Sequence, residues 1–198
     1  MFKLYKDSIF KNYANFSGRA ARKEFWTFAL FNWIIAIIVG LLQFFIELVG
    51  VPFMVAYELY PINPAMVIVW PLNIVYFIWQ MFIWIPSISI SIRRLHDINR
   101  TGWWYLLPLP FNIVFIISLV IGIAFFIGAE QSYSSSDADM FFAFGGVTII
   151  VAIIFIIFSV ITNIVLLIFY ILKGTEGNNR FGADPLQTSF DTKEVLHK

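Results

Sequence analysis

The stretch RRLHDINRTGWW, residues 93–104, holds the side chains of this sequence that are best suited to chemistry. It contains three arginines, one aspartate, two adjacent tryptophans and one of the two histidines in the chain. An imidazole titrates near neutral pH, so His96 is suited to act as a general base, with Asp97 or Asp184 to orient it. The sequence therefore offers His96, Asp97 and Asp184 as candidate catalytic residues.

The same charges are also spaced to pair with one another. Side chains three or four positions apart on a helix are neighbours, so Asp97 can pair with Arg93 or Arg94. A wider set of ion pairs could hold the helix ends together. It would join Arg19, Arg22, Arg93 and Arg94 to Glu24, Asp97, Glu176 and Asp184. The structural and the ligand-binding interpretations of these charges both stay open at this point.

Metal and cofactor chemistry find little support in the sequence. Imidazole and carboxylate groups are competent metal ligands, but Asp97 stands next to two arginines, which favours ion pairs. The chain has no cysteine, which excludes thiolate ligands and thiol catalysis. The zinc-protease spacing H-E-x-x-H and the phosphate-loop motif are both absent. We therefore predict no metal site and no cofactor. Because no catalytic motif is complete, the sequence favours a protein that is not an enzyme.

The amino-acid composition is that of a membrane protein. Only 13% of the residues are charged and 60% are hydrophobic, whereas a soluble domain carries about 25% charged residues. A membrane-spanning helix needs about 20 mostly apolar residues, and four stretches meet that requirement. They are residues 25–49, 65–92, 103–127 and 141–172. We predict an all-α membrane protein with four transmembrane helices, which form a single integral membrane domain over residues 1–198 with a tail at 173–198.

The positions of the charges predict how the chain is oriented. All 13 lysines and arginines precede the first span, lie between the second and third, or follow the fourth. The other two loops, together with the end of the first span, hold acidic residues and no cation: Glu47, Glu58, Glu130, Asp137 and Asp139. Because basic loops stay in the cytoplasm, both termini are predicted to be cytoplasmic.

The first residues, MFKLYKDSIFKNY, place Phe2, Tyr5, Ile9 and Tyr13 at helical spacing with lysines between them. This pattern predicts an amphipathic helix that lies in the cytoplasmic membrane interface, with lysines near anionic headgroups. A helix packed against the rest of the protein would show the same pattern, so that alternative stays open.

Three smaller features mark the ends of the spans. Ser17 is a candidate N-cap for the helix of the first span. Trp26 is expected at the membrane boundary, where tryptophans are enriched. Gly174 is a candidate C-cap for the fourth span.

Three ordered blocks of charged and aromatic residues resemble a known family. They read FSGRAARKEFW at residues 16–26, RRLHD at 93–97 followed by GWW at 102–104, and GTEGNNRFGADP at 174–185. The chain resembles the bacterial inner-membrane family known as domain of unknown function 805, from about Tyr13 to Pro185. That resemblance implies an integral protein of the bacterial inner membrane and supplies no mechanism. The residues that match are Phe16, Gly18, Arg19, Arg22, Glu24, Phe25 and Trp26, then Arg93, Arg94, Leu95, His96, Asp97, Gly102 and Trp103, then Gly174, Thr175, Gly177, Asn178, Phe181, Gly182, Asp184 and Pro185.

The predicted topology brings all three blocks to one cytoplasmic surface. Guanidinium groups at headgroup depth can make bidentate hydrogen bonds to phosphate or carboxylate, and anionic lipid headgroups are the nearest such groups. We therefore predict a non-enzymatic module that binds anionic lipid headgroups or a partner protein on this surface. The candidate residues, for ligand binding or for structural ion pairs, are Arg19, Arg22, Glu24, Trp26, Arg93, Arg94, Asp97, Arg100, Trp103, Asn178 and Arg180.

Two other classes of function stay open on the sequence alone. One is an enzyme that acts on a lipid headgroup through His96 and Asp97. The other is an oligomeric pore or a transporter subunit, for which Glu47 would be the ionisable residue within a span. A homo-oligomer or a membrane partner protein is compatible with either, and the charge pattern does not indicate nucleic acid.

Overall fold

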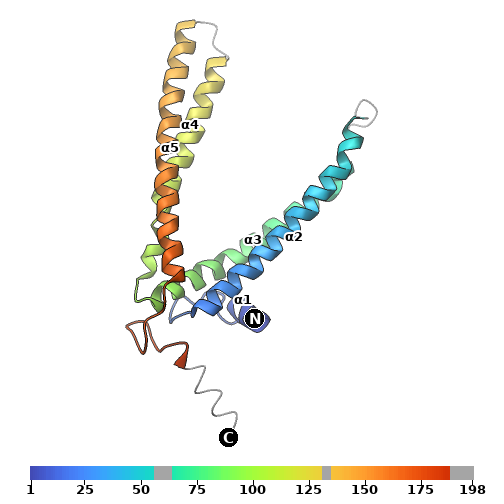
Figure 1. The fold of residues 1–198 in the computed structure, drawn as a ribbon. Coiled ribbons are helices and arrows are strands. Elements are labelled where there is room, and N and C mark those ends of the chain that lie inside the picture. The colour runs from blue at the N-terminus through green and yellow to red at the C-terminus, as the bar shows by residue number, and fades with distance from the viewer. Residues whose placement is uncertain (56–63, 131–134, 188–198) are drawn as a thin grey trace. The chain divides into compact units, whose positions relative to one another are not determined.

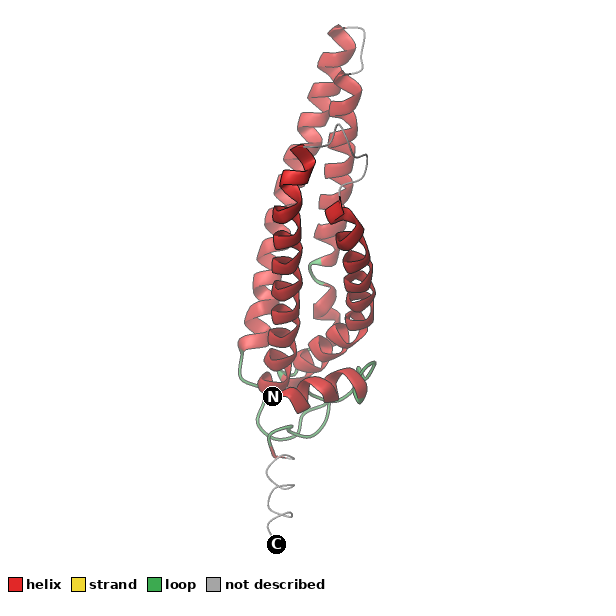
Figure 2. Cartoon of the chain, turned by 90° about the vertical axis from the view of Figure 1, so that its right-hand side faces the viewer, coloured by secondary structure: helices red, strands yellow, loops and turns green. Residues whose placement is uncertain are grey.

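The computed structural model describes residues 1–55, 64–130 and 135–187, and the regular elements within these ranges are helices (Figures 1 and 2). Four of them are long and apolar enough to cross a membrane. They are α2 (Arg22–Val55), α3 (Pro64–Asp97), α4 (Leu109–Glu130) and α5 (Ser135–Ile171). The predicted all-α architecture with four spans is confirmed.

The chain divides into two compact units. The first contains residues 1–99 together with the residues that follow 172, and the second contains residues 100–172. Each unit has one pair of long helices that run side by side: α2 with α3 in the first, and α4 with α5 in the second (Figure 1).

In the first unit, helix α1 (Phe2–Phe10) packs against α2. Tyr5 and Ile9 are buried, and the Tyr5 ring stacks on Phe31 with centroids 4.9 Å apart. Phe2 and Phe10 stay exposed. The predicted amphipathic helix therefore exists, and one side of it packs on the protein. That its remaining surface lies in a membrane interface stays a prediction.

Helix α3 runs through two prolines, Pro71 and Pro86. Pro86 has no N–H to donate to the carbonyl of Phe82, four residues earlier in the helix. The hydroxyl of Tyr13 donates to that carbonyl at 3.0 Å. A polar group of the N-terminal segment thus replaces the hydrogen bond that the proline removes, as spanning helices with prolines require.

The loop between α1 and α2 is fixed by the last turns of α3. The fully buried Ser89 donates to the carbonyl of Asn15 at 2.6 Å, and the N–H of Ala20 donates to the carbonyl of Arg93 at 3.0 Å. The predicted N-cap at Ser17 is wrong. Helix α2 begins only at Arg22, because the loop first has to pass along α3, and the Ser17 hydroxyl bonds to the Asn15 side chain instead.

In the second unit, the third span does not begin as an α-helix at Trp103. A short 3-10 helix, η1 (Gly102–Leu106), comes first, and α4 starts at Leu109. Pro108 and Pro110 have no N–H, so a continuous helix would lose two of three consecutive hydrogen bonds here. The prolines break the span near its start and leave a turn between the two helices.

Candidate functional site

Asp97, the last residue of α3, is the centre of a buried cluster of charges. Its carboxylate accepts a hydrogen bond from Nε of Arg19 at 3.0 Å and forms an ion pair with Arg94. Arg19 comes from the loop before α2, whereas Arg94 lies one helical turn before Asp97. The side chains of the two arginines are 1% and 0% exposed, and that of Asp97 is 4% exposed. Buried charges need such partners, because an unpaired ion inside a protein is costly.

A second ion pair joins Arg93 to Glu24 at 2.9 Å. Glu24 lies in the first turn of α2, where a carboxylate also interacts favourably with the helix dipole. The Ser8 hydroxyl on α1 donates to the same carboxylate at 3.4 Å. Of the two partners that helix spacing allowed for Asp97, the structure has Arg94 and not Arg93 in an ion pair with it. Arg93 pairs across the unit with Glu24, which joins α1, α2 and α3.

The segment that follows α5 closes the C-terminal end of α3. The N–H of Thr175 donates to the carbonyl of Asp97 at 2.9 Å, and the side-chain amide of Asn179 donates to the carbonyl of His96 at 3.0 Å. Arg180 donates to the carbonyl of Asn99 at 3.0 Å. The last carbonyls of a helix have no partners within it, so this distant segment acts as the cap of α3.

Sequence reasoning did not identify Thr175 or Asn179 as contacts. It selected Asn178, which is exposed, from the adjacent pair of asparagines. A doublet of identical residues gives no indication of which one turns inward, since that depends on the glycines around it. Gly177 and Gly182 have φ angles of 70° and 133°, which other residues rarely adopt.

Gly174 has a different role from the one predicted. Helix α5 ends at Ile171, and Gly174 is not among the glycines with positive φ, so the predicted C-cap is wrong. A Cβ atom placed on Gly174 would collide with the carboxylate of Asp97. The glycine is needed here because it lets the chain pass close to that carboxylate on its way to Thr175.

His96 is held by neighbours other than the carboxylates. Its ring stacks on Phe181 with centroids 3.9 Å apart and an interplanar angle of 4°. Its Nδ1 atom lies 3.1 Å from the carbonyl oxygen of Gly18. These contacts fix the ring against the loop before α2 and against the segment after α5, while the carboxylate of Asp97 lies between two arginines.

Asp184, the third candidate catalytic residue, organises the segment after α5. Its buried carboxylate accepts the N–H of Leu186 at 2.9 Å and the N–H of Gly177 at 3.2 Å. Such carboxylate-to-backbone bonds stabilise turns. Within the described part of the chain, no group of three or more potential metal-ligating side chains is placed to hold a metal ion.

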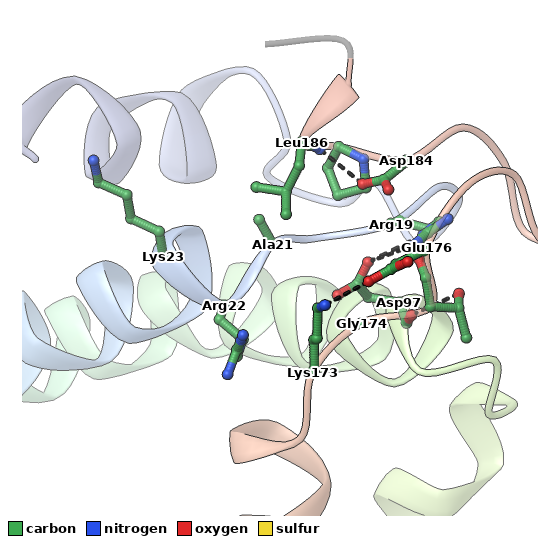
Figure 3. A pocket seen from close by; sticks show the side chains of 12 residues that line it. Arg19, Ala21, Arg22, Lys23, Asp97, Lys173, Gly174, Glu176, Asp184 and Leu186 are labelled. Atoms are coloured by element: carbon green, nitrogen blue, oxygen red, sulfur yellow. Dashed lines mark hydrogen bonds and ion pairs between the residues drawn. The ribbon is translucent and has the colours of Figure 1, made fainter. Parts of the chain in front are cut away.

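A pocket of about 230 Å³ opens beside the buried cluster, where α2 begins and α3 ends (Figure 3). Lys173 bonds to Glu176 at its edge, and Lys23 points away from Asp97. The hydrogen bond and charge of Lys173 hold the pKa of Glu176 below its usual value. The charged residues that line the pocket are Arg19, Arg22, Lys23 and Lys173, with Asp97, Glu176 and Asp184. Because Arg94 also faces Asp97, cations outnumber acids here, and the pocket is suited to an anion.

The remaining candidate residues lie elsewhere. Trp26 is 38% exposed on α2, and the guanidinium of Arg180 lies over the Phe181 ring at 4.7 Å. Arg100 and Trp103 belong to the second unit. The structure therefore brings together most of the first and third charged blocks and the RRLHD part of the second.

Comparisons with known proteins place the chain among membrane proteins. The family model described as protein of unknown function (DUF805) matches residues 13–183. The chain is 28% identical to inner membrane protein YhaI of Escherichia coli K12 over 178 residues, which cover 90% of this chain and 92% of that protein. It is 33% identical to inner membrane protein YhaH of the same strain over 117 residues, which cover 57% of this chain and 76% of that protein. No solved structure matches the chain. With the family model covering most of its length and four helices able to span a membrane, the chain belongs to the DUF805 family and is an all-α membrane protein.

Proposed function

We propose that the protein is a non-enzymatic membrane module whose pocket beside Asp97 binds the phosphate group of anionic lipid headgroups. One observation carries the proposal: this pocket has more cations than acids, and the deepest arginines already have carboxylate partners. The cations nearer the edge, Arg22 and Lys173, are exposed. These two side chains could bind a ligand while the ion pairs of the buried cluster stay intact.

The place of the pocket in the chain supports a lipid as the source of the phosphate. The candidate span of α2 begins at Arg22 and that of α3 ends at Asp97, which supports a position of the pocket at a membrane boundary. Basic pockets between helices at that depth bind phospholipid headgroups. The N-terminus of α2 adds partial positive charge at the same point.

The orientation of the protein is part of the proposal. All lysines and arginines fall in the segments on the side of the pocket, which supports a cytoplasmic position for that side and for both termini. The pocket would then face the leaflet whose surface attracts basic segments through its anionic lipids.

Native mass spectrometry of the full chain from mild detergent tests the proposal, with phosphatidylglycerol and phosphatidylcholine supplied in equal amounts. Wild type should retain phosphatidylglycerol in preference to phosphatidylcholine. The variant Arg22→Gln with Lys173→Gln should retain less phosphatidylglycerol than wild type, because it removes two cations from the pocket. Its thermal unfolding midpoint is measured alongside, so that a misfolded variant is recognised.

A matched control keeps both positive charges of the pocket, as Arg22→Lys with Lys173→Arg. This control should retain as much phosphatidylglycerol as wild type. Equal loss in both variants, or equal retention of both lipids by wild type, would refute binding at the pocket.

A further inference from the structure

The break between η1 and α4 in the second unit leaves an apolar groove of about 450 Å³. Pro108 and Pro110 cause the break, and the residues around it form the groove. Those residues are Trp103, Trp104, Leu106, Leu107, Pro110 and Phe111. Trp103 is 78% exposed, so the groove is open on that side.

The backbone around the groove indicates how deep in the membrane the groove lies. Carbonyls that lose their helical partners at a break are not tolerated in contact with the hydrocarbon core. The break lies within the first eight residues of the third candidate span, which begins at Gly102. Adjacent tryptophans are typical of the zone between headgroups and acyl chains. The groove therefore opens at that zone, where it can receive the part of an acyl chain nearest the headgroup.

A cation stands at the edge of this groove. The guanidinium carbon of Arg100 lies 5.4 Å from the ring centroid of Trp104 and 5.6 Å from that of Phe169. The ion pairs found among the described residues do not include Arg100. The N–H groups of a guanidinium lie in one plane, so they can form a fork with phosphate oxygens while the group lies over these rings.

We infer that this groove is a second lipid site, which takes an anionic glycerophospholipid with its phosphate on Arg100 and one acyl chain against the tryptophans and Phe111. The apolar lining and the cation that lies over Trp104 match the two halves of that ligand. The site lies in the second unit and shares no residue with the pocket beside Asp97. It therefore does not depend on the function proposed for that pocket.

Photocrosslinking in liposomes tests the inference on the full chain. The photoreactive residue p-benzoylphenylalanine replaces Leu106 in the groove, or Ile117 on α4 as a reference position that is 53% exposed. The liposomes contain equal amounts of phosphatidylglycerol and phosphatidylcholine, and mass spectrometry gives the ratio of the two adducts. The ratio at Leu106 should exceed that at Ile117 about fivefold, roughly the effect of one basic side chain at an anionic surface.

The variant Arg100→Gln should bring the ratio at Leu106 down to that at Ile117. Its matched control is Arg180→Gln, which removes another guanidinium that lies over an aromatic ring and should leave the ratio unchanged. The pocket variant Arg22→Gln with Lys173→Gln should also leave it unchanged. Equal ratios at the two positions in wild type, no effect of Arg100→Gln, or an equal fall in all variants would overturn the inference.

Discussion

Asp97 holds two buried guanidinium groups, and this arrangement determines how its variants should behave. Removing one member of a buried ion pair costs more than the pair itself contributes, because a charge is left without a partner. The variant Asp97→Asn leaves the guanidinium groups of Arg19 and Arg94 buried without a carboxylate partner. We expect it to lower the free energy of unfolding by about 3 to 5 kcal/mol, measured by thermal unfolding in mild detergent.

The control for this variant is Asp7→Asn. Asp7 pairs with Lys11 at 3.1 Å, but that lysine side chain is 72% exposed. Surface pairs of this kind contribute less than about 1 kcal/mol, so this control should unfold close to wild type. If Asp97→Asn were as stable as Asp7→Asn, the buried cluster would not hold the unit together.

Gly174 gives a second prediction at the scale of single residues. A methyl group at this position would meet the Asp97 carboxylate, so Gly174→Ala has to displace either the carboxylate or the chain. Overpacking of this kind costs about 1 to 3 kcal/mol, which the same unfolding measurement would detect. Gly146→Ala on α5 is the control, since a Cβ there has no neighbour within 4 Å. If Gly174→Ala unfolded at the same temperature as wild type, the chain at Gly174 would not be packed tightly against the Asp97 carboxylate.

Spacing along the sequence identified some of these contacts and missed others. Arg94 and Asp97 lie three residues apart on one helix, so their pairing follows from helix geometry. The partners of Arg19 and Arg93 lie 78 and 69 residues away. They depend on how the loop before α2 passes α3, and no local pattern encodes that path. The role of Gly174 depends on the same packing.

At the scale of elements, the segment after α5 substitutes for a local cap on α3. Asn179 bonds to the carbonyl of His96 and to the hydroxyl of Thr175. Asn179→Ala should therefore loosen the segment and speed hydrogen exchange at the Thr175 amide, which bonds to Asp97. Hydrogen exchange with mass spectrometry measures this on the full chain.

The neighbouring asparagine provides the control for this experiment. Asn178→Ala changes the same residue type at an exposed position, so exchange at Thr175 should stay as in wild type. Equal acceleration in both variants would show that the asparagine doublet, and not the cap made by Asn179, orders the segment.

Hydropathy identified the four spans because their length and apolar content suffice for that purpose. It did not give their ends. Helices α2 and α3 extend past the apolar runs into charged residues, to Arg22 and Asp97. The acidic residues at these two ends, Glu24 and Asp97, both form ion pairs with arginines. The 3-10 helix before Leu109, at the start of the third span, appeared only in the structure.

At the scale of the whole molecule, charge asymmetry predicts the orientation in the membrane. A reporter that is active only in the periplasm should be silent when fused after Lys198 and active when inserted within residues 131–134. The reason is that all 13 cations fall on the side of the termini. The opposite pattern of activity would place the pocket and both termini outside the cytoplasm.

The pocket beside Asp97 is proposed to receive a phosphate in addition to its internal ion pairs. A structure of the full chain determined in nanodiscs with phosphatidylglycerol tests this most directly. We expect phosphate density within hydrogen-bonding distance of Arg22 or Lys173, with Asp97 still bonded to Arg19 and Arg94. A pocket without phosphate, in a structure that resolves lipids elsewhere around the helices, would contradict it.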